Sequence, residues 1–238
     1  MFTLNHFIWL GISIIIIVGM LLLQKYKKLS FNTILTIVFC IAVLSELIKT
    51  ASNMIEIYKG GRVLDPGDLP LHLCSIQIFF LFALKFCIKK EETKEKLLAF
   101  MIPTMLLGGF IALFIPTVGV RFNKLQVYQF FGFHSMIVFF AIYLIKEKKV
   151  TYTWKTYGQN MGYLGIMAMC VTWLNSILSG AYEKVNFMYL VRPPMENLPI
   201  LNLNNGWYVY FITLISIVIV VMFIFHIIMI LLNKKSNK

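Results

Sequence analysis

Charged side chains are scarce in this chain, and negative ones are the scarcest. Only 13% of the residues are charged, and 10 Asp and Glu stand against 22 Lys and Arg, whereas a typical soluble domain carries about 25% charged residues. Together with 59% hydrophobic residues and a mean hydropathy of +0.80, this excludes an ordinary soluble protein and indicates an integral membrane protein. The net charge of +12 is accounted for by lysines in cytoplasmic loops. We therefore expect no nucleic-acid partner.

Cysteine is also rare, and its spacing excludes several kinds of site. The four cysteines lie within or at the ends of apolar segments, and none forms a CxxC pair: Cys40, Cys74, Cys87 and Cys170. A zinc site or a disulfide framework needs closer or more regular spacing. We expect neither a metal nor another cofactor, and the individual thiols remain to be explained.

Long apolar stretches dominate what is present. A helix needs about 20 mostly apolar residues to cross a bilayer, and seven stretches qualify: Phe7 to Leu23, Phe31 to Asn53, Leu71 to Ile88, Leu97 to Ile115, Val127 to Ile145, Gly158 to Ser179 and Trp207 to Leu232. The first has no basic leader and no polar domain after it, so it is expected to be a retained helix. The fold class predicted is all-α, a polytopic bundle of about seven transmembrane helices in a single domain, residues 1–238.

Lysine and arginine are distributed unevenly between the connections. Alternate connections carry 14 cations on one side: Lys25, Lys27, Lys28, Lys89, Lys90, Lys94, Lys96, Lys146, Lys148, Lys149, Lys155, Lys234, Lys235 and Lys238. The other side carries six: Lys59, Arg62, Arg121, Lys124, Lys184 and Arg192. By the positive-inside rule, the N-terminus lies outside and the C-terminus in the cytoplasm. We expect a multi-pass protein of the cell membrane.

Ionisable groups inside a membrane are costly and are functional candidates. In the second span, Glu46, Lys49, Thr50 and Asn53 follow the spacing i, i+3, i+4, i+7 and share one helical face. This face is expected to point toward protein or water. Two interpretations stay open: Glu46 and Lys49 pair with each other to fix helix packing, or the stripe binds a substrate.

The third span begins after "DPGDLP" and contains "LHLCSIQ". Asp68 is expected to cap the helix, and Pro70 to lie in its first turn. Cys74 then shares a stripe with Gln77. His72 lies two positions from Cys74, about 200° around a helix, so it does not face Cys74 if both are helical.

A base for Cys74 must therefore come from another span, and His134 in "FFGFHSM" is the candidate. On a rise of 1.5 Å per residue, His134 lies about 10 Å below the outer surface and Cys74 about 5 Å shallower. Their meeting requires the third helix to begin below the surface. Asn175 and Asn53 add further polar groups in the outer half of the bilayer.

A cysteine and a histidine in one pocket are suited to acyl transfer. A buried thiol is inert until a base removes its proton. Gln77, Asn175 or backbone amides at the start of the third helix are candidate donors to the oxyanion. At a membrane the natural substrate is a lipid ester, which gives a thioester intermediate. Both a hydrolase and a transferase are consistent with these residues.

Three segments resemble a known family. They are "LPLHLCSI" (Leu69 to Ile76), "FHS" around His134, and the loop "NFMYLVRPP…GWYVY" that contains Asn186 and Tyr189. They resemble the bacterial YwaF-type integral membrane proteins, which are related to the eukaryotic transmembrane protein 164, a cysteine-dependent lipid acyltransferase. The resemblance implies Cys74 as the nucleophile and His134 as its base or acid. It implies structural or substrate-facing roles for His72, Asn186 and Tyr189, and a bacterial plasma membrane as the location.

The leading hypothesis is thus an acyltransferase or esterase that acts on acyl groups of a phospholipid, a lysophospholipid or a lipoprotein. The alternative is a non-enzymatic protein that binds or transports a small solute through Glu46, Lys49, Asn53 and Asn175. A third interpretation is a structural or sensory bundle whose outer loops contact a partner. The sequence leaves the oligomeric state open.

Overall fold

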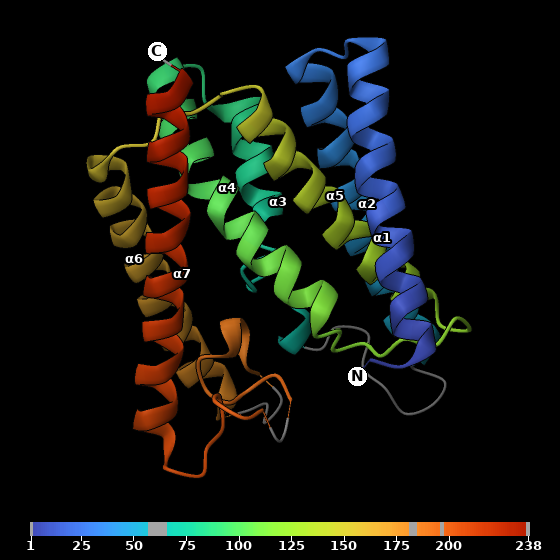
Figure 1. Ribbon diagram of the computed structural model, residues 1–238. Coiled ribbons are helices and arrows are strands. Elements are labelled where there is room, and N and C mark those ends of the chain that lie inside the picture. Colours follow the sequence, from blue (N-terminus) through green and yellow to red (C-terminus); the bar gives the residue numbers. More distant parts are fainter. Residues whose placement is uncertain (1, 57–65, 181–184, 196–197, 237–238) are drawn as a thin grey trace. The chain divides into compact units, whose positions relative to one another are not determined.

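The computed structural model describes residues 2–56, 66–180, 185–195 and 198–236. Within these residues the chain is all-α, as predicted. The seven α-helices are α1 (Leu4–Lys27), α2 (Phe31–Glu56), α3 (Gln77–Phe82), α4 (Glu91–Phe114), α5 (Leu125–Lys146), α6 (Trp154–Ser179) and α7 (Trp207–Ser236), with short turns of helix η2 (Pro66–Asp68), η3 (Ala83–Cys87) and η4 (Phe187–Tyr189) (Figure 1).

Six of these helices are long and apolar enough to cross a membrane: α1, α2, α4, α5, α6 and α7. The chain is therefore a multi-pass membrane protein. The helices alone do not show on which side of the membrane each terminus lies, so the N-terminus outside and the C-terminus in the cytoplasm stay a prediction. The third predicted span differs from the others, because only Gln77–Cys87 is helical, a length of about 16 Å at 1.5 Å per residue.

The late start of α3 has a local cause. Pro70 disfavours a helical conformation at Leu69, and the Leu71 N–H bonds back to the Leu69 carbonyl at 2.7 Å, which closes a tight turn instead of a helical one. The prediction that Asp68 caps this helix is wrong, since Asp68 ends the 3₁₀ turn η2 and Ile76 holds the cap position of α3. Residue 72 lies in a bend, and residues 73–76 form turns.

The helices group into two compact units, which are described separately. The first unit contains Met1–Asp65 and Leu73–Lys149, and the second contains Pro66–His72 and Val150–Lys238. In the first unit α5 is the central helix, packed against α1, α2 and α4 (Figure 1). Its apolar side chains, such as Phe131, Phe139 and Phe140, are fully buried, so α5 provides the core of this unit.

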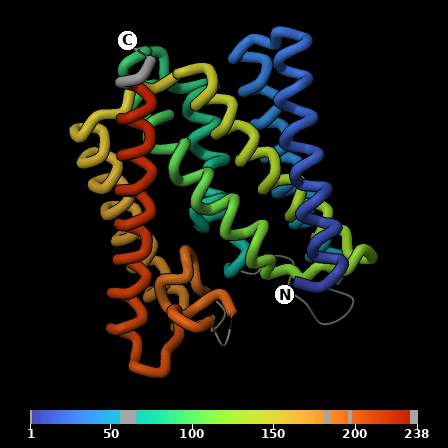
Figure 2. The backbone as a smooth tube through the Cα atoms, in the orientation of Figure 1, coloured from blue at the N-terminus to red at the C-terminus, as the bar shows by residue number. Residues whose placement is uncertain are grey.

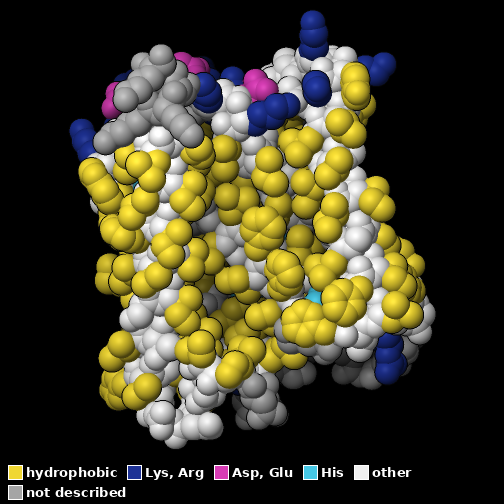
Figure 3. Space-filling model, in the orientation of Figure 1, with side chains coloured by type: hydrophobic (Ala, Val, Ile, Leu, Met, Phe, Trp, Pro, Cys, Tyr) yellow, Lys and Arg dark blue, Asp and Glu magenta, His cyan; other side chains and the backbone are white. Residues whose placement is uncertain are grey.

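The ends of α1 are fixed by polar contacts. Thr3 caps its start by accepting a hydrogen bond from the His6 N–H, and Lys25 and Lys27 lie in its last turn, where positive charge stabilises the helix dipole. Figure 3 shows Lys and Arg gathered at the end of this unit where α1 passes into α2, with hydrophobic side chains along the helices. His6 Nε2 donates to the Leu113 carbonyl at 2.9 Å, so this histidine ties α1 to α4.

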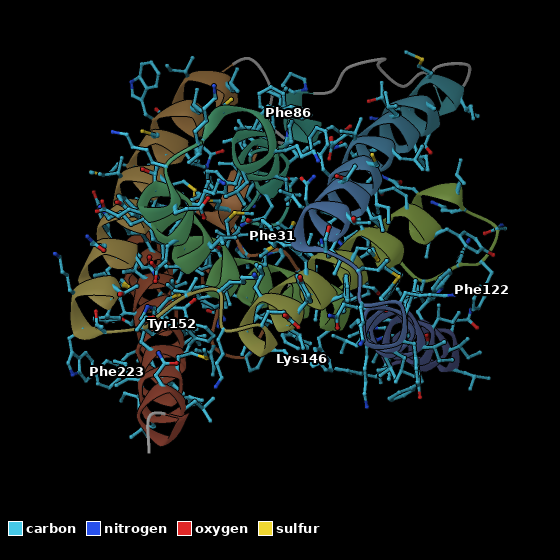
Figure 4. All side chains as sticks on the ribbon, turned by 90° about the horizontal axis from the view of Figure 1, so that it is seen from above. Phe31, Phe86, Phe122, Lys146, Tyr152 and Phe223 are labelled. Carbon is cyan, nitrogen blue, oxygen red and sulfur yellow. The ribbon has the colours of Figure 1, made fainter. Side chains whose placement is uncertain are left out.

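In the second unit, α6 and α7 run antiparallel beside each other (Figure 2). Thr153 and Thr156 form a capping box at the start of α6. His226 is buried on α7, where its Nε2 accepts a hydrogen bond from Asn160 at 3.1 Å. The Tyr152 ring packs edge-on against the His226 ring. Figure 4 labels Tyr152 and also Phe223, which lies on α7 as His226 does. Burial raises the pKa of the Tyr152 hydroxyl, which lies in the connection before α6.

Candidate active site

Cys74 lies in the turn that precedes α3, where its main chain packs directly on α4. An ideal Cβ placed on Gly108 would lie 3.2 Å from the backbone nitrogen of Cys74 and 3.5 Å from its Cβ. Small residues in membrane helices permit this kind of close backbone approach. The turn is also joined to α3, since the Gln77 N–H bonds to the Cys74 carbonyl at 3.4 Å. Gly108 therefore sets how closely the cysteine approaches α4.

His134, on α5, packs against Gly109, the next residue of α4. An ideal Cβ on Gly109 would lie 3.5 Å from the His134 carbonyl oxygen and 2.6 Å from a Val138 methyl. Adjacent residues of a helix differ by about 1.5 Å along its axis, so the backbones of Cys74 and His134 flank α4 at one level. The mismatch in depth expected from the sequence is removed because α3 begins after Cys74 and not before it.

The ring of His134 is oriented by its own helix. It is 4% exposed, and its Nδ1 lies 2.7 Å from the Phe130 carbonyl one turn earlier. A carbonyl only accepts a hydrogen bond, so Nδ1 carries the hydrogen in the neutral ring and Nε2 carries the basic electron pair. Phe130 and Phe133 pack against the ring. This tautomer is the one that a general base at Nε2 requires.

The surroundings of the sulfur keep it protonated. Cys74 lies outside the six candidate spans and outside the short helix Gln77–Cys87. Burial raises the pKa of its thiol to about 11, while the backbone N–H groups of Cys74 and Ser75 and the ammonium of Lys49 act in the opposite direction. The thiolate is therefore scarce at neutral pH, and attack by the sulfur requires a base.

The polar stripe on α2 forms an ion pair, as one of the two interpretations expected. Lys49 Nζ lies 2.6 Å from Glu46 Oε2, and Thr50 donates to the Glu46 carbonyl at 2.9 Å. Both charges are near enough to act on the thiol of Cys74. One turn of α2 also bonds to α5 through Ser45 and Gln129. Asn53 lies on α2, toward the end of the same stripe.

Gln77 is a buried polar side chain near Cys74 that is fixed by hydrogen bonds. It is 0% exposed, and its Nε2 donates to the Leu73 carbonyl at 3.1 Å and to Thr104 Oγ1 at 3.0 Å. An amide nitrogen has two hydrogens, and both are used. Gln77 therefore does not supply the oxyanion donor that its position in the sequence suggested.

The remaining predicted residues belong to the second unit, where they organise a loop. Asn175 on α6 binds both backbone groups of Phe187: its Oδ1 accepts from the N–H at 2.8 Å, and its Nδ2 donates to the carbonyl at 3.0 Å. Asn186 closes the following turn with bonds to Val191 and Arg192. These amides hold the loop in one conformation.

His72 and Tyr189 complete this loop. The Met188 N–H donates to His72 Nδ1 at 3.3 Å, and the His72 ring lies 5.2 Å from the Tyr189 ring. Tyr210 on α7 donates to the Tyr189 carbonyl. Met188 and Tyr189 both have positive φ, 54° and 56°, a backbone conformation that costs energy in residues other than glycine. The hydrogen bonds from both sides maintain it.

Three residues of the first unit were missed by sequence reasoning: Gly108, Gly109 and Thr104. The dipeptide Gly108–Gly109 inside an apolar segment was a usable signal, because adjacent small residues in a membrane helix mark close packing. Thr104 gave no such signal, since threonine commonly bonds to its own helix, as this one does to Phe100. Among the described residues, no three His, Cys, Asp or Glu lie together as a metal site.

A protein family described as the TMEM164 family matches residues 1–226. The chain belongs to the TMEM164 family. The match includes Cys74, His134 and all of the loop residues described above, and it extends into α7. No curated protein sequence and no solved structure matches the chain. Membership of the TMEM164 family thus covers both units.

Proposed function

We propose that this protein is a membrane-embedded acyltransferase or esterase that acts on lipid acyl groups, with Cys74 as the nucleophile and His134 as the base. The observation that supports it is the packing of the two residues on adjacent positions of α4, Gly108 and Gly109. The tautomer of His134 and the protonated thiol fit these roles, because one group has the proton that the other is able to accept.

In the first half-reaction, the Cys74 thiol gives its proton to His134 Nε2 as the sulfur attacks the carbonyl carbon of a lipid ester. The ester C–O bond then breaks, and the proton on Nε2 passes to the leaving alkoxide. The acyl group stays on Cys74 as a thioester. The backbone N–H groups of Cys74 and Ser75 lower the pKa of the thiol. The same groups are suited to stabilising the negative charge that develops at the reacting centre beside the sulfur.

A lipid substrate fits the location of the site. The chain crosses the membrane several times, and acyl esters of phospholipids, lysophospholipids or lipoproteins are the esters available at that depth. The resemblance to cysteine-dependent lipid acyltransferases favours the same class. With the predicted orientation, the substrate enters from the outer leaflet of the plasma membrane.

The test is labelling of membranes with a thiol-directed acyl probe. We expect labelling at position 74 in the wild type, loss of the label at this position in Cys74→Ala, and a strong decrease of it in His134→Ala. Cys40→Ala is the matched control, because Cys40 is an exposed thiol on α2. Unchanged ester turnover by Cys74→Ala contradicts the proposal. Saturable binding of a polar solute that depends on Glu46 and persists in Cys74→Ser favours the transport function instead.

A further inference from the structure

The carboxamide of Gln77 has only one possible orientation. Its nitrogen lies against the Leu73 carbonyl, which only accepts. Its second partner, Thr104 Oγ1, directs its own hydrogen to the carbonyls of Phe100 and Met101 at 2.8 and 3.0 Å, so this oxygen also accepts from Gln77. Exchanging the oxygen and nitrogen of the amide would place acceptor against acceptor twice.

This orientation leaves an acceptor without a donor. Gln77 Oε1 is fully buried and has no hydrogen-bond partner in the part of the chain that the structure describes. A buried polar atom without a partner is disfavoured, and such atoms in native proteins commonly face a water or a ligand. The protein therefore supplies no hydrogen-bond donor to this oxygen among the described residues, and a bound molecule is able to supply one.

The oxygen without a partner belongs to an amide that lies against the backbone next to Cys74. Nε2 is bonded to the carbonyl of the peptide that joins Leu73 to Cys74, and Oε1 shares a carbon atom with it. Along α4, Gly108 packs against Cys74, and Thr104, one helical turn away, bonds to Gln77. Cys74 and Gln77 thus face α4 at two successive turns.

We propose that Gln77 Oε1 binds the hydroxyl group of the acyl acceptor, a lipid alcohol or water, and orients it toward the thioester on Cys74. The inference rests on the proposed function. A lone acceptor oxygen does not bind an ester carbonyl or a phosphate, which have no hydrogen to give. A protonated amine is also a poor fit, because one neutral acceptor in an apolar site does not compensate a buried charge.

The second half-reaction then follows. The acceptor hydroxyl first donates a hydrogen bond to Gln77 Oε1, which holds it near the thioester. The hydroxyl proton then passes to His134 Nε2 while the hydroxyl oxygen attacks the thioester carbonyl carbon. The C–S bond breaks, the acyl group passes to the acceptor oxygen, and the thiolate of Cys74 takes the proton back from Nε2. Thiol and imidazole both return to their starting states.

The test separates formation of the acyl-enzyme from its decay. The full chain in detergent micelles receives para-nitrophenyl decanoate, and nitrophenolate release gives the acylation rate. After removal of the ester, intact mass follows the decay of acyl-Cys74, with and without added lysophosphatidylglycerol. In Gln77→Met we expect acylation to stay within about threefold of the wild type and decay to slow about tenfold, the size of one lost hydrogen bond.

A further variant separates orientation of the acceptor from packing. Thr104→Val removes an anchor of the amide but leaves Oε1. It is expected to slow decay less than Gln77→Met. An equal loss in Thr104→Val and Gln77→Met, or an equal loss of acylation and decay in Gln77→Met, overturns the inference.

The products identify the source of the hydroxyl group. An acylated lysolipid indicates a lipid alcohol and free decanoate indicates water, and either supports the inference when its formation depends on Gln77. Failure of the proposed function has a different result, because acylation is then the same in the wild type and in Cys74→Ala. That result removes both proposals, whereas normal acyl-enzyme decay in Gln77→Met removes only this one.

Discussion

An ideal Cβ on Gly108 lies 3.2 Å from the backbone nitrogen of Cys74, so a methyl group at this position fits only if the turn that contains Cys74 moves slightly away from α4. We expect Gly108→Ala to displace this turn by a few tenths of an ångström and to lower the rate of Cys74 acylation at least about tenfold, since reacting groups need close alignment. The measurement is the acylation rate with para-nitrophenyl decanoate.

Gly132→Ala is the matched control for this variant. Gly132 lies on α5 of the same unit, and an added Cβ meets nothing within 4 Å. It is expected to leave acylation unchanged and to stabilise the helix by roughly 0.5–1 kcal/mol. Equal rates in Gly108→Ala and Gly132→Ala would show that the approach of α4 to Cys74 does not matter for the chemistry.

His134→Asn is expected to retain the fold and lose the reaction. The Asn amide is able to donate to the Phe130 carbonyl as Nδ1 does now, but it has no basic nitrogen. Loss of a general base lowers the rate by about 10²- to 10⁴-fold. Acylation rate and apparent Tm are measured together; a normal rate at an unchanged Tm contradicts the role of His134.

The reactivity of Cys74 should depend on pH in a distinctive way. Because burial raises the pKa of this thiol to about 11, its thiolate fraction is low at neutral pH and rises tenfold per pH unit up to that value. Iodoacetamide alkylation of a variant with Cys40, Cys87 and Cys170 replaced by Ala should therefore still be accelerating at pH 10. Glutathione, an ordinary thiol, should level off above about pH 8.5. If the alkylation rate of Cys74 reaches a plateau at or below about pH 8.5, the pKa of its thiol is not raised and the prediction is wrong.

Asn175→Leu should loosen the loop that contains Phe187. The change leaves two buried backbone groups without partners, each at a cost of about 1–3 kcal/mol. We expect a Tm several degrees lower and faster proteolysis within residues 185–195. Thr172→Val is the control one turn earlier on α6, since the Thr172 hydroxyl donates to the Ala168 carbonyl of its own helix. Similar Tm values for the two variants would show that the Asn175 bonds do not stabilise the loop.

Most of the fold follows from the distribution of apolar residues. The predicted spans Phe31 to Asn53 and Val127 to Ile145 agree closely with α2 and α5. The start of α4 at Glu91 lies six residues before the predicted Leu97, because helices extend past the apolar segment into polar residues that complement the dipole. Hydropathy therefore predicts which segment crosses the membrane, whereas the capping residues determine where the helix begins and ends.

The candidate site was predictable in its residue types but not in its contacts. Cys74 and His134 were chosen from their chemistry, whereas the pairing of Gln77 with Thr104 depends on two segments that are 27 residues apart. The same holds for Asn175, which was expected in the outer half of the bundle but whose bonds go to the backbone of Phe187. A single sequence contains no direct record of which distant residues touch.

The π-helical turn η3, with Ile88 N–H bonded to the Ala83 carbonyl, is geometrically equivalent to one residue inserted into an α-helix. It places Lys85 within 2.8 Å of Asn32 Oδ1 and 2.6 Å of Thr36 Oγ1 on α2. A deletion of one residue here would restore a regular helix and rotate this lysine away from both partners. A chain shortened by one residue at this turn is thus expected to lose the polar contact between η3 and α2.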